Sequence, residues 1–179
     1  MVGIPGLTLN DAACYLIEEL QVGGVILFRR NLESPQQVAT LTRDLQELAF
    51  AATGRHLLMA IDQEGGPVQR LQPPFTQMPA GREWGQQDDP RAVARLTAQV
   101  GREMRLVGIN MNMAPVLDVA RGVESPLWQR SYGSEPEKVA RLGLAAMRGF
   151  TAGGVIPVAK HFPGLGSTTL DSPQDTPPV

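Results

Sequence analysis

The chain has a single cysteine, Cys14, among its 179 residues. One cysteine excludes a disulfide within the chain and fits a reducing compartment, so we expect a cytoplasmic protein. Histidine and lysine are almost as scarce, with two of each. One histidine and one lysine are neighbours, at Lys160 and His161. This junction is therefore the first place to look for chemistry.

The sequence also lacks a basic run and a long apolar run. Its formal net charge is −2, which leaves no electrostatic footprint for nucleic acid or for a membrane surface. No stretch approaches the roughly 18 consecutive apolar residues of a membrane-spanning helix. The N-terminus lacks the basic and apolar regions of a signal peptide. We therefore expect a small, neutral molecule as the partner, and neither nucleic acid nor a membrane.

What the sequence does contain is an alternation of short apolar runs with amphipathic segments. With 42% hydrophobic residues, the chain has the composition of one globular domain. Each apolar run ends in a polar, glycine-containing or proline-containing turn, as buried strands do. The expected strands are Val2–Ile4, Gly24–Phe28, Leu57–Ile61, Val107–Met113 and Val155–Ala159.

The amphipathic segments carry helix start signals. These signals are Asn10-Asp11, Ser34-Pro35-Gln36-Gln37, Asp89-Pro90 and Ser134-Glu135-Pro136-Glu137. The second of them has the form of a capping box with proline at the first helical position. The fourth helix is expected to run to Phe150 and to stop at Gly153-Gly154. The result is a strand–helix repeat.

A strand–helix repeat predicts a parallel sheet covered by helices. No Gly-x-Gly-x-x-Gly follows a strand, which argues against a doubly wound dinucleotide-binding sheet. The polar residues of interest follow strands, where a (β/α)₈ TIM-barrel-type fold keeps its sites. About five β/α units cannot close such a barrel, so we expect an N-terminal part of one. Its open edge is expected to favour self-association.

The third strand is followed by Asp62-Gln63-Glu64-Gly65-Gly66-Pro67-Val68-Gln69-Arg70. Paired carboxylates serve glycosidic cleavage, metal-assisted hydrolysis or the binding of sugar hydroxyls, because one carboxylate accepts hydrogen bonds from two adjacent hydroxyls. The alternative interpretation is an ion pair between Asp62 and Arg70 that braces a loop.

Two further segments carry candidate ligand-binding groups. Arg130 is able to fork onto a ligand oxygen, or equally to hold Asp118 or Asp62. The fifth strand delivers Lys160, which donates to hydroxyls or, if desolvated, forms a Schiff base. His161 is placed to donate to the same ligand. Because an unpaired lysine is costly to bury, the pair indicates a polar pocket.

Four segments, AIDQEGGPVQRL, NMNMAPVLDVA, QRSYGSEPEKVARLG and KHFPGLGSTTLDS, resemble the N-terminal barrel of glycoside hydrolase family 3. The resemblance is specific to the single-domain β-N-acetylhexosaminidases of that family, and the four segments occur in order over nearly the whole chain. It implies that residues 1–179 form an incomplete catalytic barrel of this family.

The resemblance also implies a function and a set of site residues. The implied reaction is retaining hydrolysis of terminal β-linked N-acetylglucosamine from glycans or peptidoglycan fragments, with no metal and no cofactor. The family's sugar-contacting aspartate, two arginines, lysine and histidine match five residues here, namely Asp62, Arg70, Arg130, Lys160 and His161.

The catalytic groups of the family match less well. Its nucleophilic aspartate follows a later strand and is expected beyond Val179. In the hexosaminidase branch, the general acid/base is a histidine two residues after an aspartate. Here Asp171 is present, but Pro173 stands where that histidine is expected, and proline neither donates nor accepts a proton.

Three hypotheses follow. The first is a family 3 exo-β-N-acetylglucosaminidase, of which this chain is the N-terminal part. The second is a non-catalytic N-acetylglucosamine-binding module or an inactive fragment, in line with Pro173. The third is a lyase or aldolase-like barrel that uses Lys160 as a Schiff base.

Overall fold

A computed structural model describes residues 1–166 of the chain and has a five-stranded parallel sheet at its centre. The strands follow the order β1-β2-β3-β6-β7, and each neighbouring pair is parallel. Their bounds are β1 Val2–Gly3, β2 Gly24–Leu27, β3 Leu58–Ile61, β6 Met111–Asn112 and β7 Ile156–Pro157. The predicted parallel arrangement is therefore confirmed, with every strand shorter than expected.

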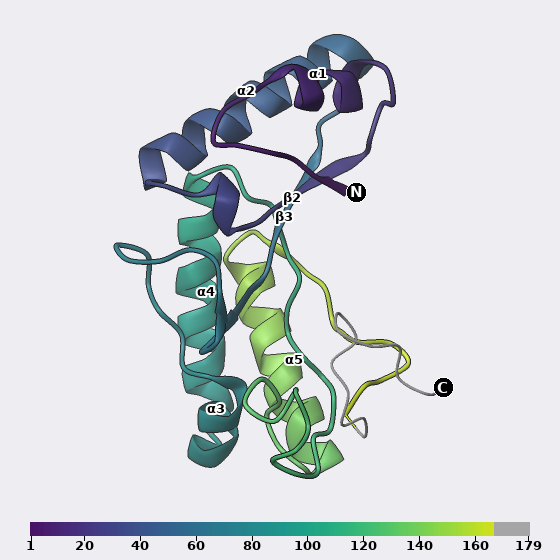
Figure 1. Cartoon of the computed structure of the whole chain (residues 1–179). Helices are drawn as coiled ribbons and strands as arrows, with labels where there is room; N and C mark the ends of the chain where they lie inside the picture. The colour runs from purple at the N-terminus through teal and green to yellow at the C-terminus, as the bar shows by residue number, and fades with distance from the viewer. Residues whose placement is uncertain (167–179) are drawn as a thin grey trace.

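Four long helices connect these strands. They are α1 Asp11–Glu18, α2 Pro35–Thr53, α4 Pro90–Leu106 and α5 Pro136–Ala152. Figure 1 shows α1 and α2 together at one end of the molecule, and α4 and α5 side by side at the other. The predicted caps of the first three are present, because Asn10, Ser34 and Asp89 each accept a hydrogen bond from a first-turn backbone N–H.

One detail of the helix starts was predicted wrongly. Ser34 caps α2 through the backbone N–H of Gln37, but the Gln37 side chain accepts from the backbone of Glu33 rather than from Ser34. The Gln37 amide is drawn there because its Nε2 also donates to Leu7 and Asn31 carbonyls. Helix α5 begins at Pro136, inside its predicted start signal, and ends at Ala152 directly before Gly153-Gly154, as predicted.

The fourth predicted strand, 107–113, was too long. Val107 ends α4, and Gly108 has a φ of +79°, so the chain turns before it enters β6. The Thr42 hydroxyl donates to the Val107 carbonyl and holds this turn against α2. Apolar content alone could not separate a helix end from a strand start.

The sequence also gave no signal for the elements between β3 and α4. Strands β4 Gln63–Gly65 and β5 Val68–Gln69 form an antiparallel hairpin, and α3 Gly81–Gln87 follows. A short 3₁₀ helix, Arg29–Asn31, follows β2. The hairpin is too short for a hydrophobic period to reveal it. It nevertheless carries Glu64, and Asp62 and Arg70 lie directly before and after it.

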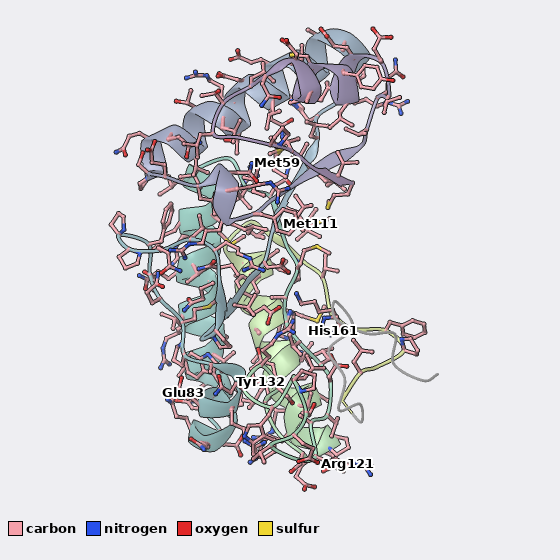
Figure 2. All side chains as sticks on the ribbon, in the orientation of Figure 1. Met59, Glu83, Met111, Arg121, Tyr132 and His161 are labelled. Carbon is pink, nitrogen blue, oxygen red and sulfur yellow. The ribbon has the colours of Figure 1, made fainter. Side chains whose placement is uncertain are left out.

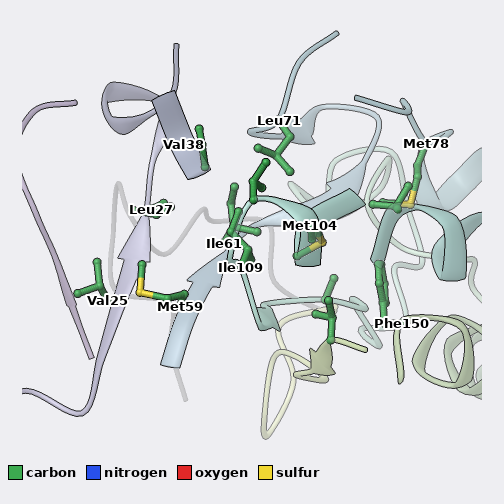
Figure 3. Packing of buried hydrophobic residues seen from close by; sticks show 14 of the residues in the cluster. Val25, Leu27, Val38, Met59, Ile61, Leu71, Met78, Met104, Ile109 and Phe150 are labelled. Atoms are coloured by element: carbon green, nitrogen blue, oxygen red, sulfur yellow. The ribbon is translucent and has the colours of Figure 1, made fainter. Parts of the chain in front are cut away.

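The hydrophobic core lies between the sheet and the helices. Figure 3 shows Val25, Leu27, Met59 and Ile61 from β2 and β3 packed in one layer. Met104 of α4 and Phe150 of α5 continue the same cluster. Burial of each such side chain is worth about 1.5–3 kcal/mol, so this layer fixes where the strand ends lie.

The described part of the sheet does not close on itself. Strands β1 and β7 are its two edges, so five β/α units form part of a TIM-barrel-type fold. Among residues 1–166, no helix has both the length and the apolar character that crossing a bilayer requires.

Candidate active site

Asp62 and Lys160 come from different strands and meet at the carboxyl edge of the sheet. Asp62 follows β3 directly, and Lys160 lies three residues after β7. The Lys160 Nζ donates to Asp62 Oδ1 at 2.7 Å. The same ammonium lies 2.6 Å from Glu64 Oε1. Both neighbours are carboxylates and Lys160 is only 14% exposed, so the pairing stabilises its charge in a largely buried position.

Glu64 is the most deeply buried member of this cluster, with 4% of its side chain exposed. Arg130 donates to both of its oxygens, from Nε to Oε2 and from Nη2 to Oε1, each at 2.8 Å. This two-point geometry is the fork that a guanidinium offers to a carboxylate. Desolvation lowers the pKa of Arg130, but the hydrogen bonds and charge of Glu64, together with the charges of Asp62 and Asp118, outweigh it, so the pKa is raised overall. Of the partners considered for Arg130 from the sequence, neither Asp118 nor Asp62 is the one it binds.

Arg70 completes the charged cluster more loosely. Its Nη2 lies 3.8 Å from Asp62 Oδ2, which is an ion pair without a hydrogen bond. Its Nε is buried and has no hydrogen-bond partner within residues 1–166. The predicted Asp62–Arg70 bracing pair is thus present but weak, since Lys160 is the closer partner of Asp62.

A buried amide pair explains why the hairpin holds Asp62 and Glu64 in place. The backbone N–H of Gln63 donates to Asn112 Oδ1 at 3.0 Å, and Asn112 Nδ2 donates to the Gln63 carbonyl at 2.8 Å. The Gln63 side chain also accepts from the backbone of Arg70 and Leu71. All of these groups are satisfied, so the loop after β3 is fixed against β6.

His161 lies beside this cluster and has its own carboxylate partner. Its ring Nδ1 is 2.7 Å from Asp118 Oδ2, and its backbone N–H donates to the same oxygen at 3.0 Å. The Asp118 side chain is fully buried. Burial raises the pKa of the Asp118 carboxyl, but hydrogen bonds from the His161 ring and from the Leu165 and His161 backbones outweigh it, so the pKa is lowered overall.

A cavity of about 720 Å³ opens beside Lys160 and His161, at the edge of the charged cluster. Its lining includes Asp118, Arg121, Lys160, His161 and the almost fully exposed Phe162. Figure 2 labels His161 at the start of the segment that follows β7, with Tyr132 on the α5 side of it. A cavity of this size accommodates a small polar ligand.

The structure brings together the five residues singled out from the sequence in two adjoining groups. Asp62, Arg70, Arg130 and Lys160 share the ion cluster, while His161 stands next to Lys160 on Asp118. Asp171 and Pro173 lie outside the described residues. That the five residues contact a sugar stays a prediction.

Sequence reasoning missed the parts played by Glu64 and Asp118. The signal for Glu64 was its spacing from Asp62, because residues i and i+2 of an extended segment point to the same side. The signal for Asp118 was its position shortly after the fourth strand, equivalent to that of Asp62 after the third. No group of three or more histidine, cysteine, aspartate or glutamate residues within 1–166 is arranged to hold a metal ion.

Comparison with known proteins gives a consistent set of relatives. Residues 2–179 match the family model described as "Glycosyl hydrolase family 3 N terminal domain". A protein named beta-hexosaminidase from Thioalkalivibrio sulfidiphilus is 39% identical over 178 residues, which cover 96% of this chain and 50% of that protein. The chain spans about half the length of the curated relatives it matches.

Solved structures agree with the sequence relatives. A family 3 beta-N-acetylglucosaminidase from Paenibacillus sp. str. FPU-7 superposes with a TM-score of 0.93 at 46% identity, over 96% of this chain and 33% of that one. NagZ from Neisseria gonorrhoeae, solved in complex with N-trifluoroacetyl-D-glucosamine, superposes with a TM-score of 0.86 at 35% identity. That match covers 93% of this chain and 50% of the other.

Proposed function

The chain belongs to glycoside hydrolase family 3, and we propose that it supplies the sugar-binding half of an enzyme that removes terminal β-linked N-acetylglucosamine. The proposal rests on one observation above all. Lys160 is held between two carboxylates, beside His161, on the wall of a cavity. Relatives that are named for hexosaminidase or acetylglucosaminidase activity support the choice of sugar.

The cluster has the donors and acceptors that a pyranose needs. The Lys160 ammonium has three protons, of which one is donated to Asp62 while Glu64 lies in ion-pair contact, so donor capacity remains for a sugar hydroxyl. The Asp62 carboxylate, 16% exposed, has lone pairs left to accept from adjacent hydroxyls. Arg130 uses one edge of its guanidinium on Glu64 and keeps the other for a ligand oxygen.

The proposed reaction is hydrolysis with retention at the anomeric carbon. A retaining glycosidase needs a nucleophilic carboxylate and a general acid/base on the two sides of the scissile bond. The residues of the described cluster bind and orient the sugar instead, because Asp62 and Glu64 are engaged with Lys160 and Arg130. The nucleophile is therefore not assigned to this cluster, and Asp171, the aspartate expected beside the acid/base, lies outside the described residues.

A second candidate function is binding without hydrolysis. Pro173 at the position expected for the acid/base histidine favours it, because loss of a general acid/base costs about 10²–10⁴-fold in rate. The Schiff-base hypothesis has less support. Imine formation needs an amine that is free to attack a carbonyl carbon, whereas the Lys160 Nζ is engaged by Asp62 at 2.7 Å and Glu64 at 2.6 Å.

The substrate class and the compartment belong to the same proposal. N-acetylglucosamine ends occur on glycans and on peptidoglycan fragments, and we propose substrates from either class. The single cysteine is consistent with action in the cytoplasm.

The decisive experiment uses the full-length protein and p-nitrophenyl N-acetyl-β-D-glucosaminide. We expect release of p-nitrophenol, with the β-anomer of the sugar formed first. Asp62→Ala should lower kcat/KM by at least about 10- to 100-fold, because it removes charged hydrogen bonds to the sugar. Asp88→Ala, which breaks a surface pair with Arg141, is the matched control and should leave the rate unchanged.

The same samples separate the two candidate functions. Calorimetric binding of N-acetylglucosamine without any release of p-nitrophenol would establish the binding module. Absence of both binding and turnover would reject the sugar site altogether.

A further inference from the structure

We propose that Asp118 is a positioning residue that holds His161 with its proton on Nδ1, so that Nε2 accepts a hydrogen bond from a sugar hydroxyl in the cavity. This inference deepens the proposed function and rests on it for the identity of the ligand. It assigns to His161 the role of an acceptor, whereas the sequence had suggested a donor.

The geometry around Asp118 defines which atoms bear protons. Asp118 Oδ2 receives two bonds, from the His161 backbone N–H at 3.0 Å and from the ring Nδ1 at 2.7 Å. Its other oxygen, Oδ1, accepts from the backbone N–H of Leu165 at 2.5 Å. An ionised carboxylate only accepts, so the ring nitrogen that faces it must be the donor.

The tautomer then follows by elimination. A neutral imidazole has one protonated nitrogen and one that accepts. With Nδ1–H committed to Asp118, the accepting nitrogen is Nε2. This atom has no hydrogen-bond partner within residues 1–166, and the His161 side chain, 29% exposed, lines the cavity. The neighbouring Lys160 ammonium can only donate hydrogen bonds. The two adjacent residues therefore offer a ligand hydroxyl one donor and one acceptor.

Asp118 also fixes where the ring stands. Its three accepted hydrogen bonds tie the segment after β7, at His161 and Leu165, to the segment after β6. At Gly166 a Cβ atom would lie 2.3 Å from the Val119 carbonyl oxygen, so the two segments are in direct backbone contact there. Because the Asp118 side chain is fully buried and accepts three hydrogen bonds, it is held in one rotamer. It therefore also fixes the position of the His161 ring.

The test reads the tautomer directly. In protein labelled with ¹⁵N-histidine, at about pH 8, which lies above the ordinary titration range of histidine, two-bond ¹H–¹⁵N correlation spectra separate protonated from unprotonated ring nitrogens. The sample is the full-length protein, in which His161→Gln identifies the resonances of His161 by their loss. We expect a protonated Nδ1 and an unprotonated Nε2 at His161. A protonated Nε2, as the other tautomer or as imidazolium, would overturn the proposal.

Asp118→Asn supplies the matched perturbation. The amide is nearly isosteric, but it cannot accept all three bonds, so we expect the Nε2–H tautomer to appear at His161 while His56 is unchanged. Asp88→Asn is the control and should alter neither histidine. An unaltered His161 tautomer in a folded Asp118→Asn protein would refute the assignment.

Addition of N-acetylglucosamine completes the test. We expect the Nε2 resonance to shift as it accepts a hydrogen bond. An unmoved Nε2 in a sample that binds the sugar calorimetrically would refute the acceptor role. A sample that binds no sugar would instead refute the proposed function, and the tautomer spectra would still decide the role of Asp118.

Kinetics of the full-length protein give a second readout. Asp118→Asn should lower kcat/KM by about 10- to 100-fold, the usual effect of removing a group that orients a ligand-binding histidine. If Asp118 acts through His161, Asp118→Asn should add little to His161→Ala in the double variant. Fully additive losses would indicate a structural role only and would contradict the proposal.

Discussion

Glu64 and Arg130 are 66 positions apart in the sequence, yet both oxygens of the Glu64 carboxylate accept from the Arg130 guanidinium at 2.8 Å. Glu64 also touches Lys160 at 2.6 Å. One buried carboxylate therefore holds two cations from different loops. Glu64 is the structural centre of the cluster, and its side chain is almost fully buried.

Glu64→Gln should destabilise the protein strongly. The amide keeps the shape but removes the charge that balances Arg130 and Lys160, and breaking a buried ion pair costs about 3–5 kcal/mol. Denaturant unfolding measures the loss. Asp88→Asn removes the exposed partner of Arg141 and should cost at most about 1 kcal/mol. Equal effects of the two substitutions would show that burial adds nothing to the Glu64 pair.

Lys160→Met should weaken N-acetylglucosamine binding by about 10- to 100-fold, the value of a hydrogen bond to a charged group. Methionine approximates the apolar stem of the lysine side chain but lacks the ammonium group. The chain has one other lysine, Lys138, whose Nζ donates to the Gly85 carbonyl away from the cluster. Lys138→Met is therefore the control, and calorimetry should find its affinity unaltered. Undiminished binding by Lys160→Met would remove this lysine from the sugar site.

The contribution of Asp118 to stability should disappear in acid. Its pKa in the folded protein is lowered from the ordinary 3.8, because the hydrogen bonds from His161 and Leu165 outweigh burial. A carboxyl with a depressed folded pKa stabilises the protein fully above 3.8, and this contribution is lost as the pH falls below that value. Asp118→Asn removes the titration. The difference in unfolding free energy between the two proteins should therefore shrink as the pH falls below 3.8, and a constant difference would contradict the lowered pKa.

Two glycines with positive φ offer a matched comparison of steric demand. At Gly65, φ is +111° and an added Cβ would lie 2.3 Å from the Pro79 carbonyl oxygen. At Gly54, φ is +70° and no atom lies within 4 Å of that position. We expect Gly54→Ala to cost about 1 kcal/mol from the backbone alone. Gly65→Ala should cost about 1–3 kcal/mol more, because the hairpin must shift. Thermal unfolding of the two variants measures the difference in stability. Equal losses would show that the hairpin shifts without a free-energy cost.

The isolated 179-residue chain should self-associate through its open sheet edge. Strand β7 is an edge strand, and Ile156 within it is 49% exposed. Light scattering should give a mass above that of the monomer. Ile156→Lys should lower the apparent mass, because a charged side chain on an edge opposes strand pairing. A monodisperse monomer that melts cooperatively would refute this expectation.

Much of the fold was predictable from local patterns. The caps at Asn10, Ser34 and Asp89 were readable because each uses a side chain within a few residues of the backbone it satisfies. The parallel sheet followed from the strand–helix repeat, since parallel neighbours require crossovers. The β4–β5 hairpin escaped prediction because two- and three-residue strands show no period.

The sequence by itself determined which polar groups come to the carboxyl edge of the sheet, because each of them follows an apolar run. Asp62, Arg70, Lys160 and His161 were placed there correctly. Which group binds which was decided by the tertiary structure alone. Arg130 pairs with Glu64, and His161 pairs with Asp118, because pairing in a buried site depends on distances and angles between segments that are far apart in the sequence. Those distances exist only after the sheet has packed and the Gln63–Asn112 bonds have fixed the hairpin.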